Sequence, residues 1–354
     1  MKPVATASER RNHLPFWVAL FCFLVIVYAS LQPFTGWVAP AKNLLQSTAT
    51  LTTRWSYADA LFNVVAYLPF GVALSACWPV AWRFWPRWVA TIFFAAAVSL
   101  SLEMLQLWLP TRVASAVDIL ANVLGAAAGA LLGTYLVQST RLVRHLRSAR
   151  EALFIDGATG DLIIVLLLVW LAAQANPGIP LFGAVFHPGT SGSFEPAVLA
   201  VEIAQTSAAL VGIGLFTDLA MRKRWLGGLA LMTVIALAVL LKTTAAQWFL
   251  TPAAWEIWLR PGHTLGLALG AILLTALFWL PRAVKSVIAG VALLSSVLVS
   301  LLIPDLVTAK APLALFSWHY GQLLNLNGLT RTVALLWPFV ATLVLLARFG
   351  YRSK

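Results

Sequence analysis

Apolar segments of membrane-spanning length recur along the whole chain, separated by short polar stretches. A helix needs about 17 to 25 mainly apolar residues to cross the hydrocarbon core of a bilayer. The pattern therefore predicts an all-α fold, a polytopic integral membrane helical bundle of about ten transmembrane helices. The predicted helices cover residues 14–32, 61–80, 88–109, 116–137, 160–175, 197–217, 225–241, 263–280, 286–303 and 331–348.

The charges of the connecting loops predict the orientation, because Lys and Arg are retained on the cytoplasmic side of membrane proteins. With a cytoplasmic N-terminus, 17 of the 24 Lys and Arg residues fall in inside segments and the other seven in outside segments. The outside segment 176–196 has none. We therefore expect both termini to be cytoplasmic and the chain to lie in the cytoplasmic (inner) membrane.

Composition supports this class and excludes a soluble domain. Hydrophobic residues make up 61% of the chain and charged residues 10%, a balance typical of membrane proteins. The net charge of +12 comes from short clusters between apolar segments, so membrane lipids are expected partners and nucleic acid is not. Cys22 and Cys77 fall in predicted helices, no metal-ligand spacing is present, and no cofactor is expected. The oligomeric state is not determined by the sequence.

The basic loops divide the chain into three parts. We expect a four-helix membrane domain over 14–137, a basic cytoplasmic linker over 138–160, and a six-helix membrane extension over 161–348. Arginines recur at a spacing of three in the linker, which places them along one side of a short helix if the segment is helical. They are Arg141, Arg144, Arg147 and Arg150. Basic residues in this position typically contact anionic headgroups.

Carboxylates and amides gather at one level of the second, third and fourth predicted helices. Glu103 lies six residues before Leu109, about 9 Å from the outer end of its helix. Asp118 begins the fourth helix, and Asn122 follows one turn deeper on the same face. The pair Asp59 and Asn63 repeats that spacing at the outer end of the second helix. Gln106 shares a face with Glu103, and Arg54 and Arg112 lie in the adjoining outer loops.

Two accounts fit this constellation. In the functional account, repulsion and burial favour protonation of at least one of Asp59, Glu103 and Asp118, which then acts as a general acid or base or a proton site. In the structural account, the two arginines neutralise the carboxylates and the three amides satisfy them, which fixes a helix hairpin. Because the two arginines cannot neutralise all three carboxylates, we favour the functional account.

The segments YADALFNVVAYLPFG and LEMLQLWLPTRVASAVDILANVLGAAAG resemble the two signature blocks of the VanZ-like family. Matching positions are Asp59, Asn63, Pro69, Gly71, Glu103, Gln106, Pro110, Arg112, Asp118, Asn122, Gly125 and Gly129. The resemblance covers about 14–137 and implies a small membrane domain; the family's founding member is associated with teicoplanin resistance. Ser115 stands where the family often has another polar or acidic residue. The resemblance does not imply a defined reaction.

Glycines in the fourth helix form overlapping small-residue motifs at Gly125, Gly129 and Gly133. Such motifs let another helix approach the backbone closely. In the extension, Gln247, Gly266 and Gly270 reproduce the spacing of Gln106, Gly125 and Gly129, which suggests a degenerate repeat as an alternative to chance spacing. Thr244, Ala253 and Leu259 then occupy the places of Glu103, Arg112 and Asp118, so such a repeat would have lost its polar centre.

A second carboxylate and amide pair lies in the sixth predicted helix. Glu202 and Gln205 have the same spacing as Glu103 and Gln106, and they too lie about one turn from the outer side. That placement would let Glu202 join the same outer cavity as the first three carboxylates. We therefore take Glu202 as a further candidate for substrate binding.

Three functions remain open. The first is an envelope enzyme that acts on a lipid-linked precursor, with Arg54 and Arg112 binding a phosphate or carboxylate and Glu103 or Asp118 moving protons. The second is a non-enzymatic binder or transporter of an amphiphile or glycopeptide. The third is a structural scaffold. No nucleophile motif or nucleotide loop is present, so the sequence leaves open whether the protein is an enzyme.

Overall fold

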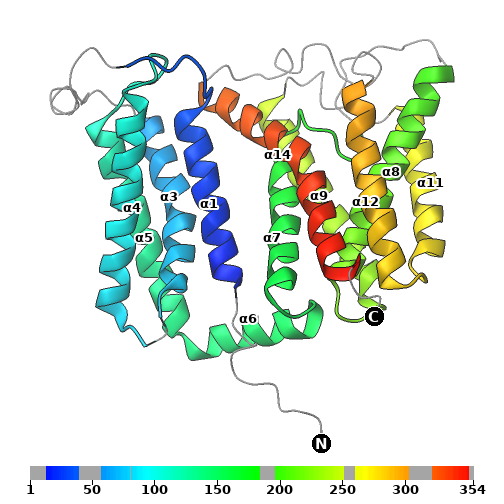
Figure 1. Ribbon diagram of the computed structural model, residues 1–354, viewed down its shortest axis with the longest axis horizontal. Helices are drawn as coiled ribbons and strands as arrows, with labels where there is room; N and C mark the ends of the chain where they lie inside the picture. The colour runs from blue at the N-terminus through cyan, green and yellow to red at the C-terminus, as the bar shows by residue number, and fades with distance from the viewer. Residues whose placement is uncertain are drawn as a thin grey trace, which may run out of the picture. The chain divides into compact units, whose positions relative to one another are not determined.

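The computed structural model describes residues 13–39, 57–79, 81–183, 196–250, 260–302 and 321–350. These residues form eleven α-helices and one short π-helix, Leu346–Gly350 (Figure 1). Within this part of the chain there is no β-strand, only isolated bridge residues such as the pair Phe154 and Met221. The predicted all-α fold is confirmed.

Ten of these helices coincide with the ten predicted spans. They are α1 (Leu14–Leu31), α3 (Tyr57–Cys77), α4 (Phe84–Gln106), α5 (Ala116–Gln138), α7 (Ala158–Ala173), α8 (Pro196–Ala220), α9 (Leu226–Phe249), α11 (Pro261–Leu277), α12 (Arg282–Leu302) and α14 (Gly321–Leu345). Eight are long and apolar enough to cross a membrane, and α7 and α11 are shorter apolar helices. The protein is a multi-pass membrane protein. The side on which each terminus lies stays a prediction, and residues 1–12 and 351–354 are outside the described residues.

The eleventh helix, α6 (Thr140–Leu153), occupies the predicted basic linker and turns sharply away from the end of α5 (Figure 1). Its arginines Arg141, Arg144 and Arg147 are exposed. Apolar side chains are exposed as well, with Leu142 at 40% and Leu146 at 62%. A helix that exposes both kinds of side chain suits the boundary between headgroups and hydrocarbon.

The chain forms two compact units, Met1–Arg150 and Glu151–Lys354. The closest helix packing in the first unit joins α3 to α5 through glycines. A Cβ atom added to Gly125 would lie 2.8 Å from the Cα of Val64, and one added to Gly129 would meet the carbonyl of Leu68. The predicted close approach of another helix to this stripe is therefore confirmed, because no side chain separates the two backbones.

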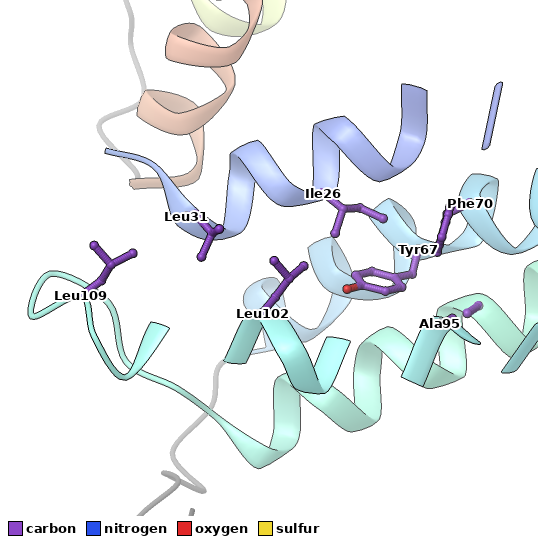
Figure 2. Close-up of a cluster of buried hydrophobic side chains, with 8 residues drawn as sticks. Ile26, Leu31, Tyr67, Phe70, Ala95, Leu102 and Leu109 are labelled. Carbon is purple, nitrogen blue, oxygen red and sulfur yellow. The ribbon is translucent and has the colours of Figure 1, made fainter. Parts of the chain in front are cut away.

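Beside this glycine contact lies the apolar core of the first unit. Figure 2 shows Ile26 of α1, Tyr67 of α3 and Leu102 of α4 pointing toward one another. Phe70 and Leu109 belong to the same buried cluster. The core thus joins α1, α3 and α4 just below the end of the bundle where the polar residues gather.

The second unit is arranged around α8, which packs most extensively against α11 and α12. Two of its carboxylates are buried in ion pairs with other segments. Asp218 Oδ2 is 2.6 Å from Lys285 Nζ of α12, and Glu202 Oε1 is 2.9 Å from Arg260 Nε at the start of α11. A charge buried in this way is tolerated because a partner replaces water.

Lys242 departs from its sequence prediction. The apolar pattern places it in an outer loop after a helix ending at residue 241, but α9 continues to Phe249 and buries this side chain. Its ammonium donates to the carbonyl oxygens of Asn176 and Ile179, at 3.1 and 2.6 Å. These carbonyls lie in the turn that follows α7, where the Asn176 carbonyl also accepts from the backbone N–H of Ile179. The two carbonyl oxygens accept the hydrogen bonds that the Lys242 ammonium would otherwise donate to water in a loop.

We expect Gly129→Ala to lower the free energy of unfolding by about 1–3 kcal/mol, because the new methyl group has to push α3 away from α5. Gly228 on α9 is the matched control, since nothing lies within 4 Å of a Cβ added there. Gly228→Ala should leave stability unchanged or raise it. The measurement is unfolding of the purified protein in detergent, and equal effects of the two substitutions would contradict the packing described.

Candidate functional site

Three carboxylates from three consecutive helices meet at one end of the first unit. Asp59 lies in the first turn of α3, Glu103 in the last turn of α4, and Asp118 in the first turn of α5. Asp118 lies within electrostatic range of both Asp59 and Glu103. The convergence follows from the alternating direction of the helices, which brings these ends together (Figure 1). We call the three carboxylates, with Asn63 and Asn122, the acidic centre.

Glu103 is buried, with 4% of its surface exposed, and connects α4 to the start of α5. Its Oε2 accepts a hydrogen bond of 2.8 Å from the backbone N–H of Ser115. Ser115 is the N-cap of α5, and its hydroxyl oxygen accepts from the backbone N–H groups of Val117 and Asp118. Glu103 therefore positions the residue that begins the helix carrying Asp118.

The amides of the acidic centre bind neighbours on adjacent helices. Asn63 of α3 donates a side-chain hydrogen bond to Asp118. Asn122 Nδ2 donates to the Ser99 hydroxyl of α4 at 3.0 Å. These short side chains reach across because α5 is in backbone contact with α3 and packs closely on α4. Each amide thus fixes the position of α5 relative to one neighbouring helix.

Five buried side-chain polar atoms in the described part of the first unit have no hydrogen bond of standard geometry, and two of them, on Asn122 and Tyr67, lie beside the acidic centre. Asn122 is 6% exposed, and its Oδ1 has no hydrogen bond. The Tyr67 hydroxyl lies within hydrogen-bonding reach of Ser99, as Asn63 does of Asp118, and within electrostatic range of Glu103, although its hydrogen-bond geometry is not standard. Because native proteins pair most buried polar atoms, unpaired atoms beside carboxylates point to a missing partner such as water or a ligand.

Arg112 and Gln106 contact the end of α1. Arg112 Nε and Nη2 donate to the carbonyl oxygen of Gln32 at 2.9 and 2.7 Å, and Nη2 also donates to that of Ala29 at 3.0 Å. Gln106 Nε2 donates to the Ser30 carbonyl at 3.1 Å. These last carbonyls of a helix otherwise lack partners. Partial burial lowers the pKa of Arg112 below the usual arginine value, but the guanidinium stays protonated at neutral pH.

Two further candidates are Arg54 and Glu202. Arg54 is outside the described residues. Glu202 belongs to the second unit, where Arg260 and His263 face its carboxylate. The structure thus brings Asp59, Glu103 and Asp118 together with Asn63 and Asn122. Arg112 makes at least three hydrogen-bond contacts to carbonyl oxygens at the end of α1. Among the described residues, no group of three His, Cys, Asp or Glu side chains has the geometry of a metal site.

Comparison with family models finds the VanZ/LLP1 family over residues 14–137. These residues form a VanZ/LLP1 domain. It contains α1, α3, α4 and α5, and hence the whole acidic centre. Comparison with curated proteins gives no match, and comparison with solved structures gives none. The family match agrees with the resemblance carried by the two signature blocks, and it identifies this part of the chain as a membrane domain of the VanZ type.

Sequence reasoning missed two hydroxyl groups of the VanZ/LLP1 domain. Tyr67 and Ser99 both lie beside the acidic centre. Helical spacing could have predicted both, because residues four apart lie on the same helix face. Tyr67 lies four residues after Asn63, and Ser99 lies four residues before Glu103. The backbone N–H of Ser115 gives no such signal, since a main-chain donor is present at nearly every residue.

Arg112→Lys should destabilise the VanZ/LLP1 domain by about 1–2 kcal/mol, because a single ammonium cannot reproduce the planar contacts to the Gln32 and Ala29 carbonyls. The exposed Arg147 on α6 serves as the control, and Arg147→Lys should have no effect. Unfolding in detergent and proteolysis of the loop between α4 and α5 measure the change. Wild-type stability of Arg112→Lys would show that the contacts to α1 are dispensable.

Proposed function

We propose that the VanZ/LLP1 domain binds the headgroup of an amphiphilic or lipid-linked cell-envelope molecule at the acidic centre, in the cytoplasmic membrane. The observation that carries the proposal is Asn122 Oδ1, which is buried without a hydrogen bond, together with the buried Tyr67 hydroxyl, which lies beside Ser99 and within electrostatic range of Glu103. Leaving a polar atom buried without a hydrogen bond costs about 1–3 kcal/mol. A bound headgroup that pairs with these atoms removes that cost.

The chemistry of the centre defines the class of headgroup. Its functional groups are three carboxylates and the Asn122 oxygen, all of which accept hydrogen bonds when the carboxylates are ionised. The complementary ligand supplies donors, such as hydroxyl, amide or ammonium groups. A lipid-linked cell-wall precursor and a glycopeptide both offer such groups. Arg112 contributes less to anion binding than its sequence position suggested, because its Nε and Nη2 are engaged with α1.

Glu103 and Asp118 are the proposed proton-binding groups, and Asp59 is the third acid. Carboxylates at this spacing repel one another when all are ionised, so a donor group or a proton stabilises the cluster. Glu103 accepts one hydrogen bond from Ser115, and Asp118 accepts one from Asn63. Each carboxylate has two oxygen atoms with several lone pairs, so capacity remains for a ligand donor.

Binding without chemistry is the form of the proposal that these observations favour. A ligand donor for the Asn122 oxygen is all that the unpaired acceptor requires, although carboxylates and hydroxyls can also serve as acid, base or nucleophile. An enzyme acting through Glu103 and Asp118 as acid and base, a transporter, and a structural scaffold are the competing functions. A role in glycopeptide resistance is an extension of the binding proposal.

Glu103→Gln should weaken binding about tenfold or more, because a charged acceptor becomes neutral and a hydrogen bond to a charged group contributes about 1.5–3 kcal/mol. The amide oxygen can still accept from Ser115, so the fold should persist. Probes are teicoplanin and a polyprenyl-linked cell-wall precursor, tested by thermal shift of the purified chain and by teicoplanin sensitivity of expressing cells. The control is Glu151→Gln on exposed α6. Unchanged binding and sensitivity at normal protein level would refute a role for this charge.

Asn122→Leu separates binding from folding. It removes the unpartnered Oδ1 as well as the bond to Ser99, so stability should change by less than about 1 kcal/mol. Ligand binding should fall, because the leucine side chain fills the place of the acceptor. Thermal unfolding with and without the same two probes measures both effects. A scaffold role predicts instead a loss of stability with no ligand-dependent difference.

A further inference from the structure

The second unit contains a buried cluster of titratable groups that the proposed function does not use. Glu202 of α8 is 4% exposed and His263 of α11 is 2% exposed. Glu202 Oε1 lies 2.9 Å from Arg260 Nε and 3.9 Å from His263 Nε2. The other imidazole nitrogen, Nδ1, is 2.8 Å from the Thr206 hydroxyl. We call Glu202, Thr206, Arg260 and His263 the Glu202 centre.

The helix pair that holds this centre repeats the packing of the first unit. α8 and α11 lie side by side (Figure 1), and glycines of α11 contact the α8 backbone. A Cβ added to Gly266 would approach Ile203, and one added to Gly270 would approach Ser207. In the first unit the corresponding contacts join Gly125 to Val64 and Gly129 to Leu68. The pair α8 and α11 is therefore packed as α3 and α5 are.

This packing aligns the two polar centres residue by residue. Asn63 precedes Val64 as Glu202 precedes Ile203, and Tyr67 precedes Leu68 as Thr206 precedes Ser207. Asn122 stands three residues before Gly125, as His263 stands three before Gly266. This comparison pairs α8 with α3 and α11 with α5, and it involves other positions than Thr244, Ala253 and Leu259 of the sequence comparison. An acid and an imidazole replace two amides, so the second centre contains groups that titrate.

We propose that Glu202 and His263 form a proton-binding site in which Arg260 and the protonated imidazole alternate as partners of the same carboxylate oxygen. With a neutral imidazole, Arg260 neutralises Glu202 at 2.9 Å, as in the structure. After proton uptake, a small movement from 3.9 Å brings His263 Nε2 within hydrogen-bond distance of the same oxygen. Two cations then compete for one carboxylate.

The surroundings accommodate both states. A hydroxyl can donate to a bare ring nitrogen or accept from a protonated one, so Thr206 pairs with His263 before and after proton uptake. Arg260 is the most accessible member, with 30% of its side chain exposed. Its long side chain can move its charge toward the membrane surface when the imidazolium takes its place. The site thus has a partner for each group in each state.

Groups from neighbouring elements surround the centre. Gln205 of α8 donates to the Ser296 carbonyl of α12. The turn after α7 covers the site, since a Cβ added to Gly183 would lie 3.2 Å from the Thr206 hydroxyl. Lys242 of α9, the nearby cation, is held by carbonyls of the segment following α7. Among the described residues, the Glu202 carboxylate faces His263 directly, and Arg260 pairs with that carboxylate.

The test uses the full chain labelled with ¹⁵N-histidine in lipid nanodiscs, observed by NMR between about pH 5 and 8.5. His263→Asn assigns the resonance. We expect its titration midpoint to fall by about one pH unit in Glu202→Gln, which removes the acceptor, and to rise by about one in Arg260→Gln, which removes the competitor. The exposed His145 on α6 is an internal reference that neither variant should move.

A His263 resonance that does not titrate in this range would overturn the proposal. So would midpoints that move in the same direction, or do not move, in Glu202→Gln and Arg260→Gln, because a purely structural imidazole gives no shift of opposite sign. If Glu202→Gln does not fold, Arg260→Gln decides alone, since Arg260 is partly exposed. The readout concerns the second unit, so its outcome is independent of ligand binding at the acidic centre.

Discussion

Polar groups within these helices have to find their partners inside the protein, because the hydrocarbon core of a bilayer offers none. Glu103 takes a main-chain N–H, Lys242 takes two main-chain carbonyls, and Asp218 takes the ammonium of Lys285. In each case the partner belongs to another helix or to the segment next to one. Polar pairing therefore decides which helices are joined, while apolar packing fills the space between them.

Glycine contacts make this pairing geometrically possible in the VanZ/LLP1 domain. Asn63 has a short side chain, yet it reaches Asp118. It can do so because the next residue of α3, Val64, is in backbone contact with Gly125 of α5. A wider separation would leave the amide and the carboxylate apart. The same logic holds in the second unit, where Gly262 lies directly against the Glu202 carboxylate. Packing and chemistry are thus coupled through residues that have no side chain.

The sequence predicted the features that depend on periodicity. Helix positions, the close contact of the glycine stripe and the shared level of Asp59, Glu103 and Asp118 all follow from spacing along single helices. Partners distant in sequence were not predictable, because a carbonyl near residue 30 looks like any other until α1 packs beside Arg112. The burial of Lys242 was missed for the same reason, since a lysine at a helix end normally indicates water.

The two ion pairs of α8 restrict the movements open to the second unit. Glu202 and Asp218 are 16 residues apart, about 24 Å along the helix axis, and different segments hold them at either end. Sliding α8 by one turn, or rotating it about its axis by part of a turn, would separate both pairs at once in an apolar medium. If the ion pair between Asp218 and Lys285 stays intact, α8 can move only by tilting about its Asp218 end. In that movement the ion pair between Glu202 and Arg260 is the one that breaks.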